Sequence, residues 1–329
     1  MKRLLLLIWC VALFAACEQG GNSVDIESRS TIAFSTKSVV RSAIAQSDID
    51  GGGATVKVYA TEDGRVLYEN AEIRRENTGK WYPTTGKTDW KSGSSYSFYG
   101  YAYNADTEVL TINDNGLSID VTQPTSYDEA KMVDYLLSYK FQVADGAMMP
   151  IVPIQLEHAM AMVEIYVVRG NLFEAQLTKM SFENIYSKGS LKCTTHSIVN
   201  EGTPNVWEIT LTGNGTTKYT LQPDQAIAIG DTREGTAAKM KILCIPQQLT
   251  ANTKLTIEYK VNEKLTSDGA NNWVPHTETF QLYKYNPMNY QSGHRIVYTA
   301  TIDSGVNIQG TIAQWNDVDY IEGTILPEI

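Results

Sequence analysis

The chain has 329 residues, of which 43% are hydrophobic and 19% charged, and its formal net charge is −10. This acidic balance argues against a nucleic-acid partner, because nucleic-acid binding depends on a basic stripe and the sequence has none. Nineteen tyrosines and abundant Thr, Val and Ile favour pleated, half-buried surfaces over helices. The composition therefore predicts an all-β protein.

Residues 1–16 have the order of a secretory signal peptide. Two basic residues provide a positive start, and an apolar stretch (residues 4–16) leads to Cys17. That stretch is shorter than the roughly 20 residues of a membrane-spanning helix. Since Ala15-Ala16-Cys17 is similar to a lipobox, we expect Cys17 to be lipidated and held in a membrane by its acyl chains. An ordinary signal peptide with a cysteine near its end is the alternative.

Without this peptide the chain keeps 313 residues and a net charge of −12, because two basic residues are lost. Residues 17–29 are polar and are expected to form a tether. At roughly 100–200 residues per domain, the remaining length suggests two domains. The Pro-punctuated stretch 149–153 is the best dividing point. We therefore expect one β-sandwich domain at residues 30–152 and a second at 153–329.

Short alternating runs, bounded by Gly, Asn, Asp and Pro, recur along the chain. Their period of two predicts antiparallel strands with one solvated face, and their regular spacing is typical of sandwiches. The clearest runs are residues 55–60, 96–102, 162–167, 207–211, 254–259 and 295–300. Residues 128–137 have enough helix formers for a turn or two, whereas the family resemblance described below implies a loop that leads into a strand.

No group of residues points to catalysis, a metal or a cofactor. Residues 85–88 (TGKT) are similar to the end of a P-loop, but Trp81 stands where that loop needs a glycine. The histidines are scattered without metal-ligand spacing, and no Gly-x-Ser-x-Gly elbow occurs. His158 is expected to be structural. The sequence therefore predicts a binding or assembly protein without catalytic residues.

Two further features leave alternatives open. The aromatic residues between positions 81 and 101 either fill a core or form a sugar-stacking platform. In the second interpretation Trp81 and Trp90 bind a glycan, and the protein is a cell-surface glycan-binding lipoprotein. Cys193 and Cys244, the cysteines left after Cys17, either form one disulfide or remain as two buried thiols.

Six segments, in chain order, resemble the fimbrillin family, the lipoprotein pilin precursors of Bacteroidales-type Gram-negative bacteria (major-fimbrillin-like and Mfa-like proteins). Two of them depart from the usual pattern, with Gly100 where Ala is usual and Met288 where Trp is common. The segments are Ile32–Ala43 with residues 56–60; Lys80–Tyr101; Leu156–Ala161; Lys241–Gln247; Met288–Tyr298; and Trp315.

The resemblance implies two tandem transthyretin-like sandwich domains and a subunit, of stalk, tip or minor type, of a fimbrium used in adhesion. It places the lipid of Cys17 in the outer membrane and the mature protein on the cell surface and in the fimbrium. It also implies that an arginine-specific protease removes an N-terminal strand, and that a donor strand of another fimbrial subunit fills the vacated groove. The adhesion target, on a host or another microbe, is not specified.

The parts of this mechanism can be assigned as hypotheses. Residues 30–41 are the removable strand, with Ile32 and Phe34 on one face, and cleavage follows Arg41 or, as second choice, Arg29. In the alternative Arg41 is an ordinary loop residue and the anchor is permanent. The tail, residues 317–329, either donates a strand or forms the last strand of its own domain, which would suit a tip subunit.

Overall fold

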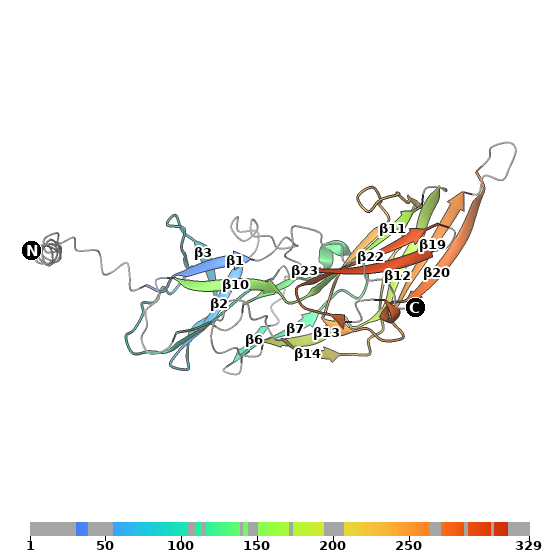
Figure 1. Cartoon of the computed structure of the whole chain (residues 1–329). Helices are drawn as coiled ribbons and strands as arrows, with labels where there is room; N and C mark the ends of the chain where they lie inside the picture. The colour runs from blue at the N-terminus through green and yellow to red at the C-terminus, as the bar shows by residue number, and fades with distance from the viewer. Residues whose placement is uncertain are drawn as a thin grey trace, which may run out of the picture.

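The computed structural model describes residues 31–38, 55–103, 110–113, 116–138, 141–143, 151–170, 174–193, 207–262, 271–285, 289–303 and 306–314. Within these ranges the regular elements are strands and two short 3₁₀ turns, which confirms the all-β expectation (Figure 1). None of the helical turns there approaches the length and apolarity of a membrane-spanning helix. Cys17, Arg29, Arg41 and the tail lie outside the described residues, so lipidation, cleavage and strand donation stay predictions.

The N-terminal part of the chain forms an eight-stranded sheet of order β2-β3-β4-β1-β10-β8-β5-β9. Strand β2 pairs along its length with both β3 and β5, so the sheet curls and closes into a barrel-like circuit, with β9 outside it. This closure differs from the open sandwich that the sequence suggests. The strands are β1 (Phe34–Ser38), β2 (Val56–Glu62), β3 (Arg65–Arg75), β4 (Trp81–Pro83), β5 (Tyr96–Tyr103), β8 (Tyr135–Leu137), β9 (Phe141–Val143) and β10 (Val152–His158).

Strand β10 crosses the expected boundary between residues 152 and 153. It is hydrogen-bonded to β1 and β8, so it belongs to the N-terminal sheet. Pro153 is tolerated inside it because the N–H of Val152 points to β1, so the position that lacks an N–H faces the other side. There, β8 pairs with β10 only at Glu157 and His158. The prolines therefore mark a strand, and the chain passes to the C-terminal sheets only after His158.

The segment with ambiguous helical pattern is a loop that leads into a strand. It contains one 3₁₀ turn (Glu129–Lys131), whose first N–H groups are capped by Asp128: the carboxylate accepts from the Ala130 N–H at 3.2 Å. Strand β8 begins four residues later. This confirms the second of the two readings of residues 128–137.

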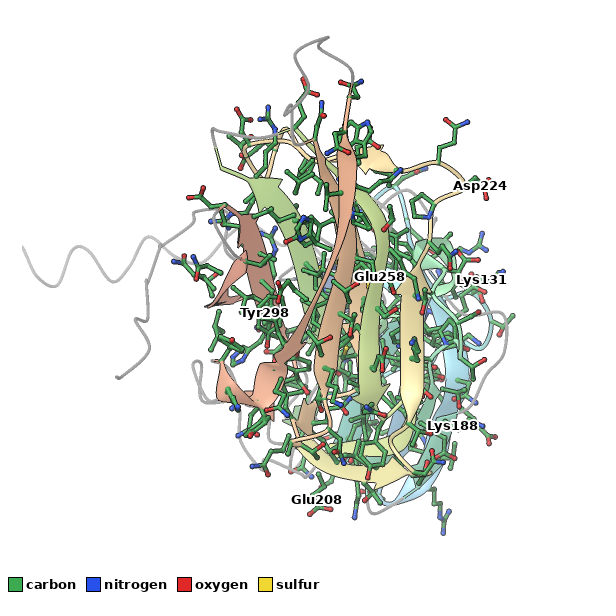
Figure 2. All side chains as sticks on the ribbon, turned by 90° about the vertical axis from the view of Figure 1, so that its right-hand side faces the viewer. Lys131, Lys188, Glu208, Asp224, Glu258 and Tyr298 are labelled. Atoms are coloured by element: carbon green, nitrogen blue, oxygen red, sulfur yellow. The ribbon has the colours of Figure 1, made fainter. Side chains whose placement is uncertain are left out.

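The C-terminal part has two larger sheets whose buried faces meet. Tyr290 joins them, since its ring packs on Phe182 of one sheet at 6.5 Å and its hydroxyl is 3.1 Å from that of Tyr298 in the other. Figure 2 looks onto the sheet that contains β19 (Lys254–Asn262), with Glu258 on its outer side.

The strands of the two sheets are as follows. One sheet has the order β17 (Lys239–Cys244), β11 (Ala161–Arg169), β22 (His294–Ile302), β23 (Val306–Gln314). The other has the order β15 (Thr217–Leu221), β12 (Ala175–Ile185), β19 (Lys254–Asn262), β20 (Trp273–Gln281), with β16 (Ile227–Ala228) also on β12. Strands β18 (Gln247–Gln248) and β21 (Asn289–Tyr290) form a small pair, and Leu282–Lys284 a 3₁₀ turn.

A fourth sheet is shared by the two halves of the sequence. Its order is β14 (Trp207–Thr212), β13 (Lys188–Cys193), β7 (Gly116–Thr122), β6 (Leu110–Asn113). Strands β7 and β13 pair antiparallel, and Ile119 and Leu191 lie opposite each other, both fully buried. Figure 1 shows this sheet below the junction of the other sheets. The core is accordingly continuous from the barrel to the C-terminal sheets.

Candidate functional site: the β1 groove

Residues 31–38 occupy a strip of the barrel between β10 and β4, which we call the β1 groove. On one side β1 runs parallel to β10, in register from Phe34 opposite Val152 to Ser38 opposite Leu156. Figure 1 shows β1 (blue) beside β10 (green). A parallel pair normally needs a long crossover, and here more than 100 residues separate the two strands. Strands β1 and β10 are therefore neighbours in space although they are far apart in the sequence.

On its other side β1 is held much less extensively. The only residue pair with β4 among the described strands is Phe34 opposite Trp81. Before the strand, the Ile32 N–H donates to the Thr88 carbonyl at 2.9 Å, and the Thr31 hydroxyl donates to Asp89 at 2.7 Å. Strand β1 is thus hydrogen-bonded along its length to β10 but paired at one residue with β4, so we expect the strand to separate first from β4.

Apolar contacts hold the strand in place. Ile32 and Phe34 are fully buried, as their alternation predicts, and the Phe34 ring packs edge-on against Phe98 at 5.7 Å and Tyr68 at 6.3 Å. Ala33, on the opposite face, is also buried, at 1% exposure, so only a small side chain fits there. Burying a side chain the size of Ile or Phe contributes about 1.5–3 kcal/mol each. Emptying the groove would therefore expose a substantial apolar strip.

Gly100 and Ile154 fit together at the inner wall of the groove. A Cβ atom on Gly100 would lie 2.2 Å from Cγ2 of Ile154, far closer than carbon atoms approach. The Gly100 backbone is fixed, because its N–H donates to the Ser138 hydroxyl at 2.6 Å and its carbonyl accepts from the Ser138 N–H at 2.8 Å. The family pattern has alanine at this position. This chain has glycine there because the side chain of Ile154 occupies the space that the alanine Cβ would need.

Thr36 lies on the same face as Ile32 and Phe34, by the alternation of the strand, and is opposite Ile154. Its hydroxyl oxygen is buried and has no hydrogen-bond partner among the described residues. The Tyr68 ring, which packs on Phe34, brings a second buried hydroxyl to the groove, and burial raises the pKa of this phenol. The strand that fills the groove therefore contributes one buried hydroxyl without a hydrogen-bond partner among the described residues.

Trp81 and Trp90 are core residues. Their exposed fractions are 5% and 6%, and the Trp90 ring packs edge-on against Tyr96 at 4.8 Å and Phe98 at 5.9 Å. An indole that stacks on a sugar needs an exposed face. The expectation that these two residues form a glycan platform is therefore not met, because the barrel uses both rings as filling.

The remaining candidates are structural or outside the groove. The His158 Nδ1 lies 3.0 Å from Asp134 Oδ1, and both side chains are fully buried at the end of β10. Cys244 is a free, buried thiol, and burial raises its pKa. The side chain of Cys193 is outside the described part. Across the described ranges, no three His, Cys, Asp or Glu side chains gather as metal ligands.

Three features of the groove were not found from the sequence. Val152, Ile154 and Leu156 alternate as a strand should, but the surrounding prolines suggested a boundary instead. The fit of Gly100 to Ile154 joins residues far apart in the chain, and the departure from the family pattern at Gly100 was its only signal. The buried hydroxyl of Thr36 has no sequence signal at all.

One family model and several solved structures are similar to this chain. A family model described as fimbrillin-like matches residues 41–315. A solved structure of a candidate cell adhesion protein from Bacteroides uniformis ATCC 8492 is 15% identical with a TM-score of 0.53, covering 87% of this chain and 99% of that one. Another, from Bacteroides ovatus ATCC 8483, is also 15% identical with a TM-score of 0.50, covering 88% and 98%. At this identity the likeness concerns the fold. No curated protein sequence matches the chain.

Proposed function

Because this chain belongs to the fimbrillin-like family, we propose that it is a structural or adhesive subunit of a bacterial surface fimbrium. It is exported as a lipoprotein precursor, with the lipid attached to Cys17, and reaches the outer membrane. An arginine-specific protease then cuts after Arg41, between β1 and β2, or after Arg29 as second choice, and β1 gives way to a strand from another subunit. The observation that carries this proposal is the seating of β1 in its groove.

The groove has the properties that strand replacement requires. If residues 31–38 leave, β10 presents the N–H groups of Val152, Ile154 and Leu156 along an open edge beside an apolar strip. An open edge of this kind is satisfied by an added strand through main-chain bonds, and pockets for alternate side chains give specificity. The short contact with β4 allows the exchange to start there. The family match, which begins at residue 41, leaves β1 outside the matched region.

Cleavage after Arg41 would separate both β1 and the lipid from the rest of the chain. Most arginines in the described part of the chain are poor protease sites, because they lie in strands whose backbone is hydrogen-bonded within a sheet and is not available to a protease. Those in strands are Arg65, Arg74, Arg75, Arg169 and Arg295, whereas Arg233 lies in a turn. Arg233 is therefore the matched control for cleavage outside the leader.

Digestion with an arginine-specific protease tests the proposal. We expect one new N-terminus at Ser42, or at Ser30 if Arg29 is cut, followed by complexes that resist SDS. Arg41→Lys should abolish the Ser42 terminus, and Arg233→Lys should change nothing. A first fragment that starts elsewhere, or complete cleavage after which β1 stays bound in the presence of partner subunits, would count against strand exchange.

The tail decides between a stalk and a tip subunit. If residues 317–329 donate a strand, the cleaved protein alone should form ladders in SDS gels, and deletion of the tail should remove them. If the subunit only accepts a strand, cleaved protein alone forms no ladder and the deletion leaves acceptance unchanged or unfolds the domain. Trp81 and Trp90 do not support the glycan-binding alternative, since neither ring offers an exposed face.

A further inference from the structure

The resident strand does not match its groove at one position. The Thr36 hydroxyl oxygen is buried and has no hydrogen-bond partner among the described residues, while the residue as a whole is half-buried. Ile154, directly opposite, is 1% exposed. A buried polar group without a partner costs free energy that an apolar group of the same shape does not. Valine has the shape of threonine with a methyl group in place of the hydroxyl.

This mismatch bears on the strand exchange proposed above, on which the following inference rests. We infer that β1 fits its groove less well than the donor strand does, and that the groove is specific for a strand with an apolar, β-branched residue at the Thr36 position. Such a strand forms the same bonds to β10 and leaves no buried hydroxyl. Replacement of β1 is then favourable even when the incoming strand makes no additional contact. The Thr36 hydroxyl gives the exchange its direction.

The groove also defines the rest of the partner strand. It runs parallel to β10, has large apolar residues at the positions of Ile32 and Phe34, and has a small residue at the buried position of Ala33. The required order is large, small, large, any residue, then apolar and β-branched. The partner is thus an extended segment with this pattern.

The chain's own tail does not have this pattern. In residues 317–329 (DVDYIEGTILPEI), no start position gives apolar residues at three alternate positions without glycine or proline among them. The alignment of Val318 with Ile32 would put Asp319 at the buried Ala33 position. The tail of a second copy of this chain therefore does not fit the groove, and the inferred donor is a segment of a different polypeptide.

The first test needs no cleavage. In the full chain Thr36→Val should raise the midpoint of urea unfolding of the barrel by roughly 0.3–1 M. The matched control is Thr210→Val on β14, whose threonine is exposed and should give no such gain. An unchanged or lowered midpoint for Thr36→Val would show that the hydroxyl is satisfied and would overturn the inference.

The second test measures exchange directly. The full chain receives an unrelated protease site after Ser38, so that cleavage does not depend on Arg41, and uptake of fluorescent peptides is followed after the cut. A peptide of residues 30–38 with T36V should bind roughly 5- to 140-fold more tightly than the native peptide. An A33L peptide and a peptide of residues 317–329 should not compete.

The outcomes separate this inference from the proposed function. Equal binding of the native and T36V peptides, or strong binding of the tail peptide, overturns the inferred specificity but leaves strand exchange standing. If no peptide enters the cut protein, strand exchange itself fails. The unfolding of Thr36→Val then still decides whether β1 is an imperfect occupant.

Discussion

Gly100→Ala should destabilise the barrel through one contact. The new Cβ would lie 2.2 Å from Ile154 Cγ2, whereas non-bonded carbons settle at about 3.5–4.0 Å. The Gly100 backbone is bonded to Ser138 at both its N–H and its carbonyl, and Ile154 is buried and stiff at χ1, so neither side moves freely. Overpacking of this kind costs about 1–3 kcal/mol. Alanine recovers about 0.5–1 kcal/mol because it is less flexible than glycine.

We therefore expect a net loss of about 1–2 kcal/mol in the free energy of unfolding. Urea titration followed by tryptophan fluorescence measures it, since Trp81 and Trp90 report on the barrel. Ile154→Leu removes the clashing methyl group at nearly constant volume and should cost less than about 1.5 kcal/mol alone. In the double variant the two losses should not add. If Gly100→Ala is as stable as the native chain, or if Ile154→Leu recovers nothing, the steric argument is wrong.

Arg295→Met removes two bonds to one Glu164 oxygen, at 2.6 and 3.1 Å, and should lower the free energy of unfolding by about 1–3 kcal/mol in urea; no loss would mean that the pair is energetically neutral. The thiol of Cys244, whose pKa is raised by burial, should react with maleimide only in denaturant, as peptide mapping by mass spectrometry would check; labelling of the native protein would contradict its burial. Trp90→Ala should cost about 3–5 kcal/mol in the same titration, whereas glycan binding lost at unchanged stability would restore the alternative function.

The sequence was sufficient for what depends on local pattern. Alternation and turn residues predict the strands, and the spacing of Ile32 and Phe34 predicts that both point into the same core. These inferences succeed because a strand has a period of two wherever one of its faces is buried. The loop before β8 was expected from the family resemblance, because the local pattern by itself allowed a helical turn or two.

Features that depend on contacts between residues far apart in the sequence could not be predicted from local patterns. Pro153 looks like a break, and only the one-sided pairing of β10 explains how a strand can hold it. Closure of the barrel depends on β2 having two neighbours, which no local pattern encodes. Trp81 and Trp90 have the same spacing whether they fill a core or line a surface, so only the fold decides between these roles.

The sheet shared by β7 and β13 has a mechanical consequence. In the proposed role as a fimbrial subunit, the chain would be under tension from both ends, and these two strands run along the long axis of the molecule (Figure 1). Their antiparallel bonds, from Lys188 opposite Thr122 to Lys192 opposite Ser118, lie across that axis. A pull that would part the two halves therefore shears all of these bonds at once and does not peel them singly. The shared sheet would make the subunit stiff in the direction in which a fimbrium is stretched.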